Sequence, residues 1–200
     1  MRHSLYDLPL AVLWLAWLAY WIFAARGLKP VRRRESAASR LLTVALTLPA
    51  ALLMAAPGRW MSWLGGRFLP NSSIAYRLGL LMVVVGLAFA VWARVHLGRN
   101  WSGTVTVKEN HELVRSGPYA IVRHPIYTGL LLAMLGTVIV LGEWRGLVAF
   151  CFLGAAFLLK LRREERFMGE SFPDTYPGYR ARVPALIPLL YGSDSGNGSR

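Results

Sequence analysis

Residues 111–129 read HELVRSGPYAIVRHPIYTG, a polar and charged stretch in a chain that is otherwise mostly hydrophobic. The stretch places His124 between two tyrosines, Tyr119 and Tyr127, and Pro125 opens a long apolar run. Proline at the first helical position is an ordinary helix start. The neighbouring His and Tyr side chains also offer hydrogen-bond donors and flat aromatic faces. Spacing alone therefore leaves two interpretations open, a plain helix start and a polar ligand site.

The composition indicates an integral membrane protein. Hydrophobic residues make up 55% of the chain and charged residues 16%, against about a quarter charged in an ordinary soluble domain. The net charge of +13 would by itself suggest a nucleic-acid partner, but the basic residues fall between apolar runs and not along one face. The single cysteine, Cys151, lies inside an apolar run. It provides neither a disulfide framework nor a thiolate metal site.

Five apolar runs, uncharged except for Arg77 near the outer end of the third, predict five transmembrane helices, because about 20 apolar residues cross a hydrocarbon core of about 30 Å. The runs are 8–25, 41–58, 74–93, 125–142 and 146–159, and a tight turn at 142–146 separates the last two. The first run is too long for the core of a signal peptide, and its basic cluster follows it instead of preceding it. It is therefore predicted to remain as a helix.

The basic residues predict the orientation. Segments 26–40, 94–124 and 160–200 together hold 18 of the 23 Lys and Arg residues. Because cytoplasmic loops carry an excess of Lys and Arg, the N-terminus is expected outside and the C-terminus in the cytoplasm. Both long polar segments then lie on the cytoplasmic side. Residues 111–127 are expected to face residues 160–182, with a site between them.

The second polar cluster is LLKLRREERF, residues 158–167. If the fifth helix continues through it, Lys160 and Glu164 share a face. A solvated helix end with salt bridges explains this pattern at a few tenths of a kcal/mol per pair, whereas an ionisable group at the membrane edge is also a functional candidate. His96, His111 and His124 match no common metal-ligand spacing, so no metal site is expected.

Four segments together resemble the isoprenylcysteine carboxyl methyltransferase family: 97–103 (LGRNWSG), 111–129, the EE pair at 164–165, and 172–184 (FPDTYPGYRARVP). They occur in the right order over about half of the chain. The resemblance implies an all-α integral membrane enzyme that uses S-adenosylmethionine and has no Rossmann domain. Its cofactor pocket would be built from the cytoplasmic connector, the start of the fourth helix and the C-terminal segment. The chain then divides into a three-helix transmembrane part (1–93), a methyltransferase part (94–191) and a disordered tail (192–200).

Carried over by position, the resemblance implies these cofactor-binding residues: His111, Glu112, Leu113, Val114, Tyr119, His124, Pro125, Ile126, Tyr127 and Glu164. The candidate catalytic residues are Lys160, Glu165 and Arg182. Animal enzymes of the family have an arginine that addresses the acceptor carboxylate four residues before the first Glu. This chain has Lys160 there, which keeps the charge but not the two-pronged fork of a guanidinium.

The methyl acceptor is expected to be lipophilic and to enter from the bilayer, and its reacting group is left open as a carboxylate, a thiol or an amine. A carboxylate or thiolate needs no general base, whereas an amine needs one, for which Glu165 is the nearest candidate. Two other classes compete with this reading: an NADPH-dependent membrane reductase and a non-catalytic membrane scaffold. The expected location is the bacterial cytoplasmic membrane, with the site facing the cytoplasm and no nucleic-acid partner.

Overall fold

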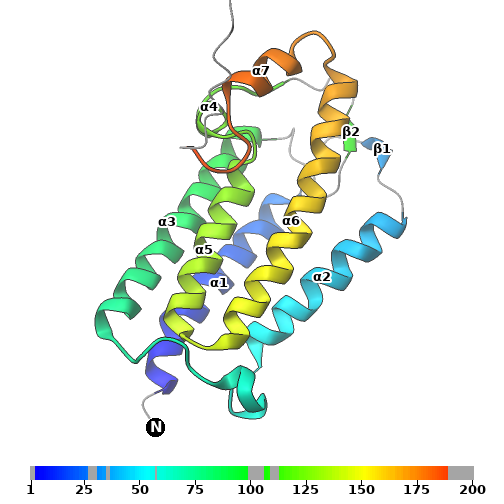
Figure 1. The fold of residues 1–200 in the computed structure, drawn as a ribbon. Coiled ribbons are helices and arrows are strands. Elements are labelled where there is room, and N and C mark those ends of the chain that lie inside the picture. Colours follow the sequence, from blue (N-terminus) through cyan, green and yellow to red (C-terminus); the bar gives the residue numbers. More distant parts are fainter. Residues whose placement is uncertain are drawn as a thin grey trace, which may run out of the picture.

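A computed structural model describes residues 3–26, 31–34, 37–56, 58–98, 106–108 and 113–188 as a bundle of helices with one small sheet (Figure 1). The elements are α1 (His3–Ala24), β1 (Val31–Arg34), α2 (Ala37–Ala55), the 3₁₀ turns η1 (Gly58–Trp60) and η2 (Ser62–Gly65), α3 (Ser73–Leu97), β2 (Thr106–Lys108), α4 (Pro118–Ile121), α5 (Pro125–Leu141), α6 (Trp144–Ser171) and α7 (Tyr176–Arg182). Each of the five predicted apolar runs is helical, as α1, α2, α3, α5 and α6. The predicted tail at 192–200 lies outside the described residues.

The long helices have the length and composition of membrane helices. α2, α3 and α6 are long and apolar enough to cross a bilayer, and Leu8–Ala24 and α5 are apolar but shorter. Large apolar side chains are exposed on the outer faces, for example Leu15 at 64% and Leu41 at 70%. The structure is therefore that of a helical membrane protein. The number of spans stays a prediction, as does the division between residues 93 and 94, which falls inside α3.

α3 and α5 form the closest helix pair, and glycines make it possible. Gly79 and Gly86 on α3 face Gly136 and Gly129 on the antiparallel α5. A Cβ added at Gly86 would lie 2.5 Å from the carbonyl oxygen of Gly129, and one added at Gly129 would lie 2.5 Å from that of Gly86. Small residues at such seams let helix backbones approach, which stabilises association inside a membrane. The seven-residue spacing on both helices repeats the contact two turns along.

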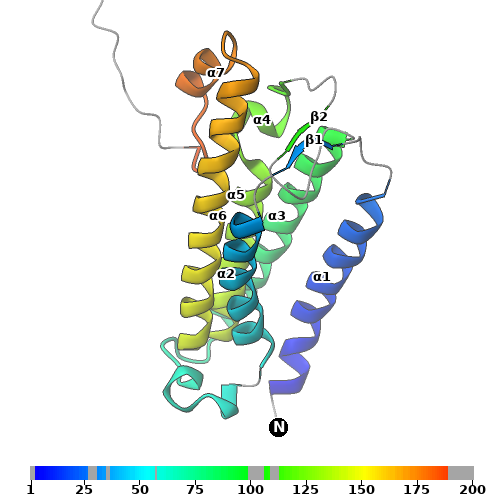
Figure 2. The same cartoon turned by 90° about the vertical axis from the view of Figure 1, so that its right-hand side faces the viewer.

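α1 packs against the α3–α5 pair, and the views in Figures 1 and 2 show α2 running instead along α6. Leu10 of α1 lies in a core cluster with Val83, Leu87 and Ala133. The indole of Trp14 donates a hydrogen bond to Thr137 Oγ1 at 3.1 Å. The series Trp14, Trp17 and Trp21 forms successive ring contacts along this face. These tryptophans therefore take part in the packing of α1.

The small sheet is a feature that the sequence did not predict. β1 pairs antiparallel with β2, with Val31 opposite Lys108 and Arg34 opposite Thr106. The predicted all-α class describes the long helices correctly but does not include this pair of strands. Two short segments that pair through their backbones show no apolar periodicity in the sequence from which strands could be predicted. Its effect is to bring the loop between α1 and α2 to the connector that follows α3, at the same end of the bundle as α4 and α7 (Figure 1).

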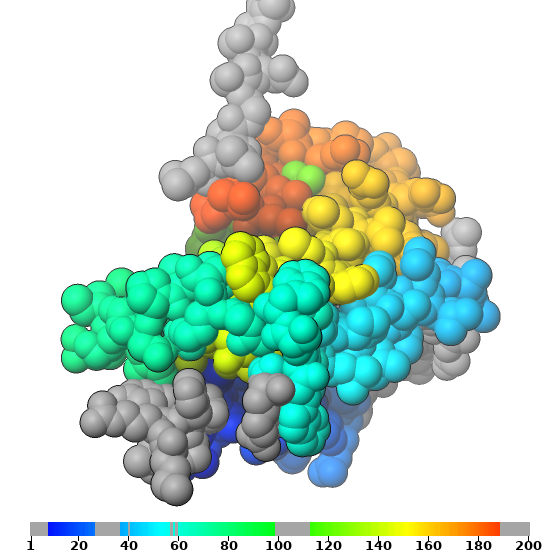
Figure 3. Space-filling view, turned by 60° about the horizontal axis from the view of Figure 1, so that its bottom comes forward, coloured from blue at the N-terminus to red at the C-terminus, as the bar shows by residue number. Residues whose placement is uncertain are grey.

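At the opposite end, two arginines cap helices. Arg145 is 5% exposed, and its Nη1 donates to the carbonyls of Leu53, Met54 and Ala56 at 2.8–2.9 Å, at the C-terminus of α2. Arg67 donates in the same way to the carbonyl of Leu141, the last residue of α5. Cations at helix C-termini are stabilised by the helix dipole. Seen from this end, the residues that connect α2 to α3 lie against the α5–α6 turn (Figure 3).

We expect Gly86→Ala to destabilise the protein by about 1–3 kcal/mol, because the added methyl group forces α3 away from α5. For a chain of this size, the apparent melting temperature in detergent falls by roughly 2–4 °C per kcal/mol. The matched control is Gly154→Ala in α6, where an added Cβ meets nothing within 4 Å. This control is expected to be neutral or slightly stabilising, since alanine is the better helix former. Equal melting temperatures for the two variants would contradict the role of the glycine seam.

Candidate functional site

The RHP turn at residues 123–125 is positioned by two prolines. Pro118 and Pro125 occupy the first turns of α4 and α5, where a missing N–H group is tolerated. Proline disfavours a helical conformation in the residue before it, and His124 accordingly has φ −124° and ψ 62°. The short α4 therefore ends, the chain crosses in extended form, and α5 begins at Pro125. His124 is left at the head of α5 with its side chain beside α6.

α6 supplies the other wall because it does not end with its apolar stretch. It continues from Leu159 to Ser171 and carries Lys160, Glu164 and Glu165 past the start of α5. The helical spacing predicted for Lys160 and Glu164 is confirmed. The structure thus brings residues 113–127, the described part of the first predicted polar segment, to the same end of the bundle as residues 160–182 (Figure 1).

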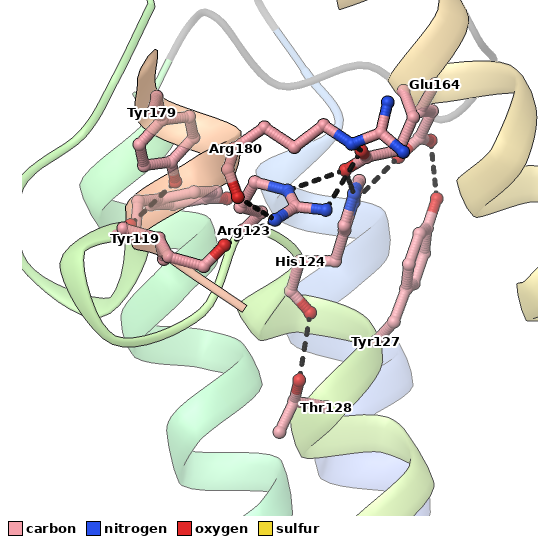
Figure 4. Close-up of polar contacts among 10 residues, drawn as sticks. Tyr119, Arg123, His124, Tyr127, Thr128, Glu164, Tyr179 and Arg180 are labelled. Atoms are coloured by element: carbon pink, nitrogen blue, oxygen red, sulfur yellow. Dashed lines mark hydrogen bonds and ion pairs between the residues drawn. The ribbon is translucent and has the colours of Figure 1, made fainter. Parts of the chain in front are cut away.

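His124 bridges both glutamates (Figure 4). Its Nε2 lies 2.8 Å from Glu165 Oε1, and its Nδ1 lies 3.4 Å from Glu164 Oε2. Tyr127 donates its hydroxyl to Glu164 Oε1. The side chains of His124 and Glu165 are 9% and 10% exposed, whereas that of Glu164 is 25% exposed. Glu164 is therefore the carboxylate of this pair that keeps more access to solvent or to a ligand.

Burial and pairing act in opposite directions on these groups. Burial would lower the pKa of His124, but hydrogen bonds with Glu164 and Glu165 outweigh burial and raise it. Glu165 lies beyond the apolar run of α6. Burial would raise its pKa, but hydrogen bonds from His124 and Arg123 lower it to about 2. The arrangement favours an imidazolium held between two carboxylates.

The aromatic side of the site is a short stack. The Tyr127 ring stacks between His124, with ring centroids 5.8 Å apart, and Phe157 of α6, at 4.9 Å. Lys160 Nζ lies 5.6 Å from the centroid of the Tyr127 ring. A cation over a tyrosine face is attracted by the ring quadrupole. Tyr127 of α5 therefore contacts both Glu164 and Lys160, which lie on the same face of α6.

The C-terminal residues close over the RHP turn through backbone contacts. The amide of Arg123 donates to Pro184 O at 2.9 Å, and that of His124 donates to Ala185 O at 3.0 Å. Thr128 Oγ1 donates to Leu186 O at 2.7 Å. The Tyr179 hydroxyl donates to Tyr119 O at 2.6 Å. Residues 176–186 are thereby fixed to the head of α5.

The structure gathers most of the predicted site residues and leaves others apart. Tyr119, His124, Pro125, Tyr127, Lys160, Glu164 and Glu165 lie around the head of α5. Leu113, Val114 and Ile126 are half-buried in the segment before α4 and in the first turn of α5. Arg182 is exposed and donates to Gly178 O within its own helix, so the structure does not bring it to the cluster. His111 and Glu112 lie outside the described residues.

Arg123 was not among the site residues predicted from the sequence. Its guanidinium makes a two-pronged contact with Glu165, with Nε 2.8 Å from Oε1 and Nη2 3.0 Å from Oε2. It stands in the RHP motif, but a basic residue beside an apolar run is so ordinary that its position carried no signal. Among the described residues, no group of three His, Cys, Asp or Glu side chains gathers as for a metal. His96 lies 2.9 Å from Ser116 Oγ and stacks on Tyr119.

Residues 79–170 match the sequence model of the isoprenylcysteine carboxyl methyltransferase family. This range contains the RHP turn and both glutamates. Over these residues, the chain is similar to that family. The family region thus includes most of α3, all of α5 and all but the last residue of α6.

Relatives of known name agree with this match. The chain is 39% identical over 101 residues to the protein-S-isoprenylcysteine O-methyltransferase of Schizosaccharomyces pombe, a match that covers 49% of this chain and 43% of the relative. It is 30% identical over 115 residues to protein-S-isoprenylcysteine O-methyltransferase B of Arabidopsis thaliana, covering 56% of this chain and 58% of the relative. It is 32% identical over 153 residues to the cobalt-zinc-cadmium resistance protein CzcN of Cupriavidus metallidurans, covering 74% and 62%.

The fold agrees as well. The solved structure of the eukaryotic intramembrane Ras methyltransferase ICMT (isoprenylcysteine carboxyl methyltransferase) superposes with a TM-score of 0.50 at 23% sequence identity. The superposition covers 80% of this chain and 56% of that one. The chain spans about half the length of the curated relatives it matches. The sequence comparisons point to the isoprenylcysteine carboxyl methyltransferase family, and the solved structure shows a similar fold.

We expect the stability of the cluster to depend on pH through His124. Because pairing raises its pKa in the folded protein, the stabilisation is complete below the ordinary histidine pKa and is lost as pH rises through the raised value. Each unit of pKa difference corresponds to about 1.4 kcal/mol. The melting temperature of His124→Gln in detergent, compared with wild type between pH 6 and pH 9, is therefore expected to show its largest deficit at pH 6. A deficit that grows with pH would contradict an imidazolium at this position.

Proposed function

We propose that this chain is an integral membrane methyltransferase that moves a methyl group from S-adenosylmethionine to a lipophilic acceptor, with a carboxylate of the prenylcysteine type as the favoured group. The observation that carries the proposal is the contact of His124 with Glu164 and Glu165, assembled from two helices inside the family region. The names of the relatives support this reading, since two are protein-S-isoprenylcysteine O-methyltransferases.

The residues present suit the proposed cofactor. S-adenosylmethionine supplies a methyl group on a positively charged sulfur and carries an ammonium, a carboxylate and an adenine ring. Glu164 is the more exposed carboxylate and would pair with the ammonium, and Tyr127, whose hydroxyl donates to Glu164, would hold that carboxylate in place. Leu113 and Val114 offer half-buried apolar surface. His111 and Glu112 are proposed to complete the pocket from the connector.

The geometry favours a carboxylate or thiolate acceptor over an amine. Glu165 is the nearest candidate base, but both of its oxygens accept hydrogen bonds from Arg123, and its pKa is lowered to about 2. A carboxylate with so low a pKa is a weak proton acceptor at neutral pH. An already ionised acceptor needs no proton removal. What the protein must do is align donor and acceptor and exclude water.

Lys160 is proposed to bind the acceptor carboxylate. It lies one turn before Glu164 on α6, where the apolar stretch of the helix ends, with its ammonium over Tyr127. A lipophilic acceptor arriving from the bilayer would present its ionised end at this level. As a point charge, Lys160 would attract the carboxylate without the fixed direction of a guanidinium. Arg182 is exposed on α7, so its position gives no support to its proposed catalytic role.

The proposed topology has five spans, with the N-terminus outside and the C-terminus in the cytoplasm. The distribution of Lys and Arg supports it. The RHP turn and the extension of α6 then lie on the cytoplasmic side, where a water-soluble cofactor arrives. The proposed location is the cytoplasmic membrane of a bacterium, in keeping with the similarity to the protein of Cupriavidus metallidurans.

We expect the purified protein to bind S-adenosylhomocysteine, the demethylated product, with saturable 1:1 stoichiometry in isothermal titration. NADPH, titrated alongside, is expected to give no heat of binding. NADPH binding without S-adenosylhomocysteine binding would overturn the proposal in favour of a reductase. The absence of both would leave a membrane scaffold.

Variants are expected to separate cofactor residues from the acceptor residue. His124→Ala and Glu164→Ala each remove hydrogen bonds to a charged group, so S-adenosylhomocysteine binding should weaken by about 10- to 100-fold. Lys160→Ala should leave this binding within about twofold and lower turnover of N-acetyl-S-farnesylcysteine. Wild-type binding in both His124→Ala and Glu164→Ala would refute the pocket assignment. Loss of binding in Lys160→Ala would assign that lysine to the cofactor.

A further inference from the structure

The guanidinium of Arg123 lies where three segments of the chain meet. Its side chain is 9% exposed. Nε and Nη2 donate to the two oxygens of Glu165 on α6, while Nη1 donates to the carbonyls of Arg180, at 3.0 Å, and Val183. In Figure 4 the group sits between Arg180 and His124. One side chain thus links the RHP turn to α6 and to the end of α7.

The same carboxylate oxygen ties Arg123 to His124. Glu165 Oε1 accepts from Arg123 Nε and from His124 Nε2, each at 2.8 Å. The fork of the arginine fixes where this oxygen lies, and the oxygen in turn directs the imidazole. With the ring so held, Nδ1 faces Glu164, the carboxylate proposed to bind the cofactor. The orientation of the cofactor site therefore depends on a residue that need not touch the cofactor.

Only an arginine satisfies this geometry. Three nitrogens of the planar guanidinium are used in two directions, two on the carboxylate and one on backbone carbonyls. A lysine ammonium keeps the charge but cannot supply a planar two-pronged contact. Arg180 provides a natural comparison, because its Nε lies 3.6 Å from the same Glu165 but its side chain is 65% exposed. Such an exposed pair contributes little.

We propose that Arg123 is a positioning residue that locks the C-terminal residues 176–186 to α6 and thereby sets the orientation of His124 in the cofactor site. The proposal rests on the proposed function for its effect on the cofactor. The contacts by which Arg123 holds residues 176–186 to α6 do not depend on the proposed function, because they are made entirely within the protein. Arg123 acts through Glu165 and the backbone, and it does not bind the acceptor.

The test compares Arg123→Gln and Arg123→Lys with the matched control Arg180→Gln. In the unliganded protein, hydrogen exchange of the amides of residues 123 and 124, which donate to Pro184 and Ala185, should accelerate about tenfold or more in both Arg123 variants. S-adenosylhomocysteine binding should weaken about tenfold in both, as expected for loss of hydrogen bonds between charged groups. Arg180→Gln should stay within about twofold of wild type in both measurements.

Steady-state kinetics separates positioning from acceptor binding. In Arg123→Lys, the KM for S-adenosylmethionine should rise, and the KM for N-acetyl-S-farnesylcysteine should stay near wild type. Restoration of exchange and binding by lysine would overturn the proposal, since charge alone would then suffice. A rise confined to the acceptor KM would overturn it too, because it would make Arg123 an acceptor ligand.

A milder variant keeps the test valid if Arg123→Gln does not fold. Thr128→Val removes one anchor of the same segment, the bond to Leu186 O, with little change in side-chain volume. It should accelerate the same amides and weaken S-adenosylhomocysteine binding by a few-fold; unchanged exchange would count against the lock. Should wild type itself not bind S-adenosylhomocysteine, the proposed function fails, and the exchange measurement still decides for or against the lock.

Discussion

Two carboxylates, an imidazole and a guanidinium are gathered, partly buried, where α5 begins, and the arrangement of that end of the molecule depends on their mutual neutralisation. A buried charge is costly unless it is paired and hydrogen-bonded, so Arg123, His124, Glu164 and Glu165 stabilise the protein only as a set. The set needs three elements to be in place: the RHP turn, the extended α6, and the C-terminal residues whose carbonyls accept from the remaining arginine nitrogen. At a membrane edge, with water on one side and hydrocarbon on the other, such a set of charges can be both stable and accessible to a ligand.

The same four residues limit the chemical roles that side chains of the site can have. An acidic residue that is to act as a base needs a free oxygen and a pKa near neutrality, and Glu165 has neither, because its oxygens are occupied by Arg123 and His124. We therefore assign Glu165 a structural role. Glu164, with a more open side chain, and Lys160, placed over Tyr127, remain as the polar groups that face outward from the stack. Catalysis in the proposed reaction comes from alignment and desolvation, which suits a site made of rigid helix ends more than one made of mobile acids and bases.

The apolar runs were predictable because hydrophobicity and length act locally, and each of the five is a helix. The meeting of the 111–127 and 160–182 segments was predictable too, since the count of basic residues placed both on one side. The seam of Gly79, Gly86, Gly129 and Gly136 was not, because it is a property of a pair of helices and neither helix shows it alone. The β1–β2 pair depends on backbone groups without a side-chain pattern. Arg123 escaped notice for a different reason: its type and place were ordinary, and only its partners are informative.

The buried Arg145 at the far end of the bundle bears on how the chain is assembled during synthesis. In the proposed topology, this charge must cross the bilayer within the α5–α6 hairpin, a step that is costly for an arginine without partners. Its partners are Glu143, on the same hairpin, and the carbonyls of Leu53, Met54 and Ala56, which end a helix that is made earlier. A nascent α2 already in the membrane would therefore offer the hairpin a docking point as it enters. For Arg145, the order of the helices along the chain then matches an order of insertion in which its backbone acceptors are already in the membrane.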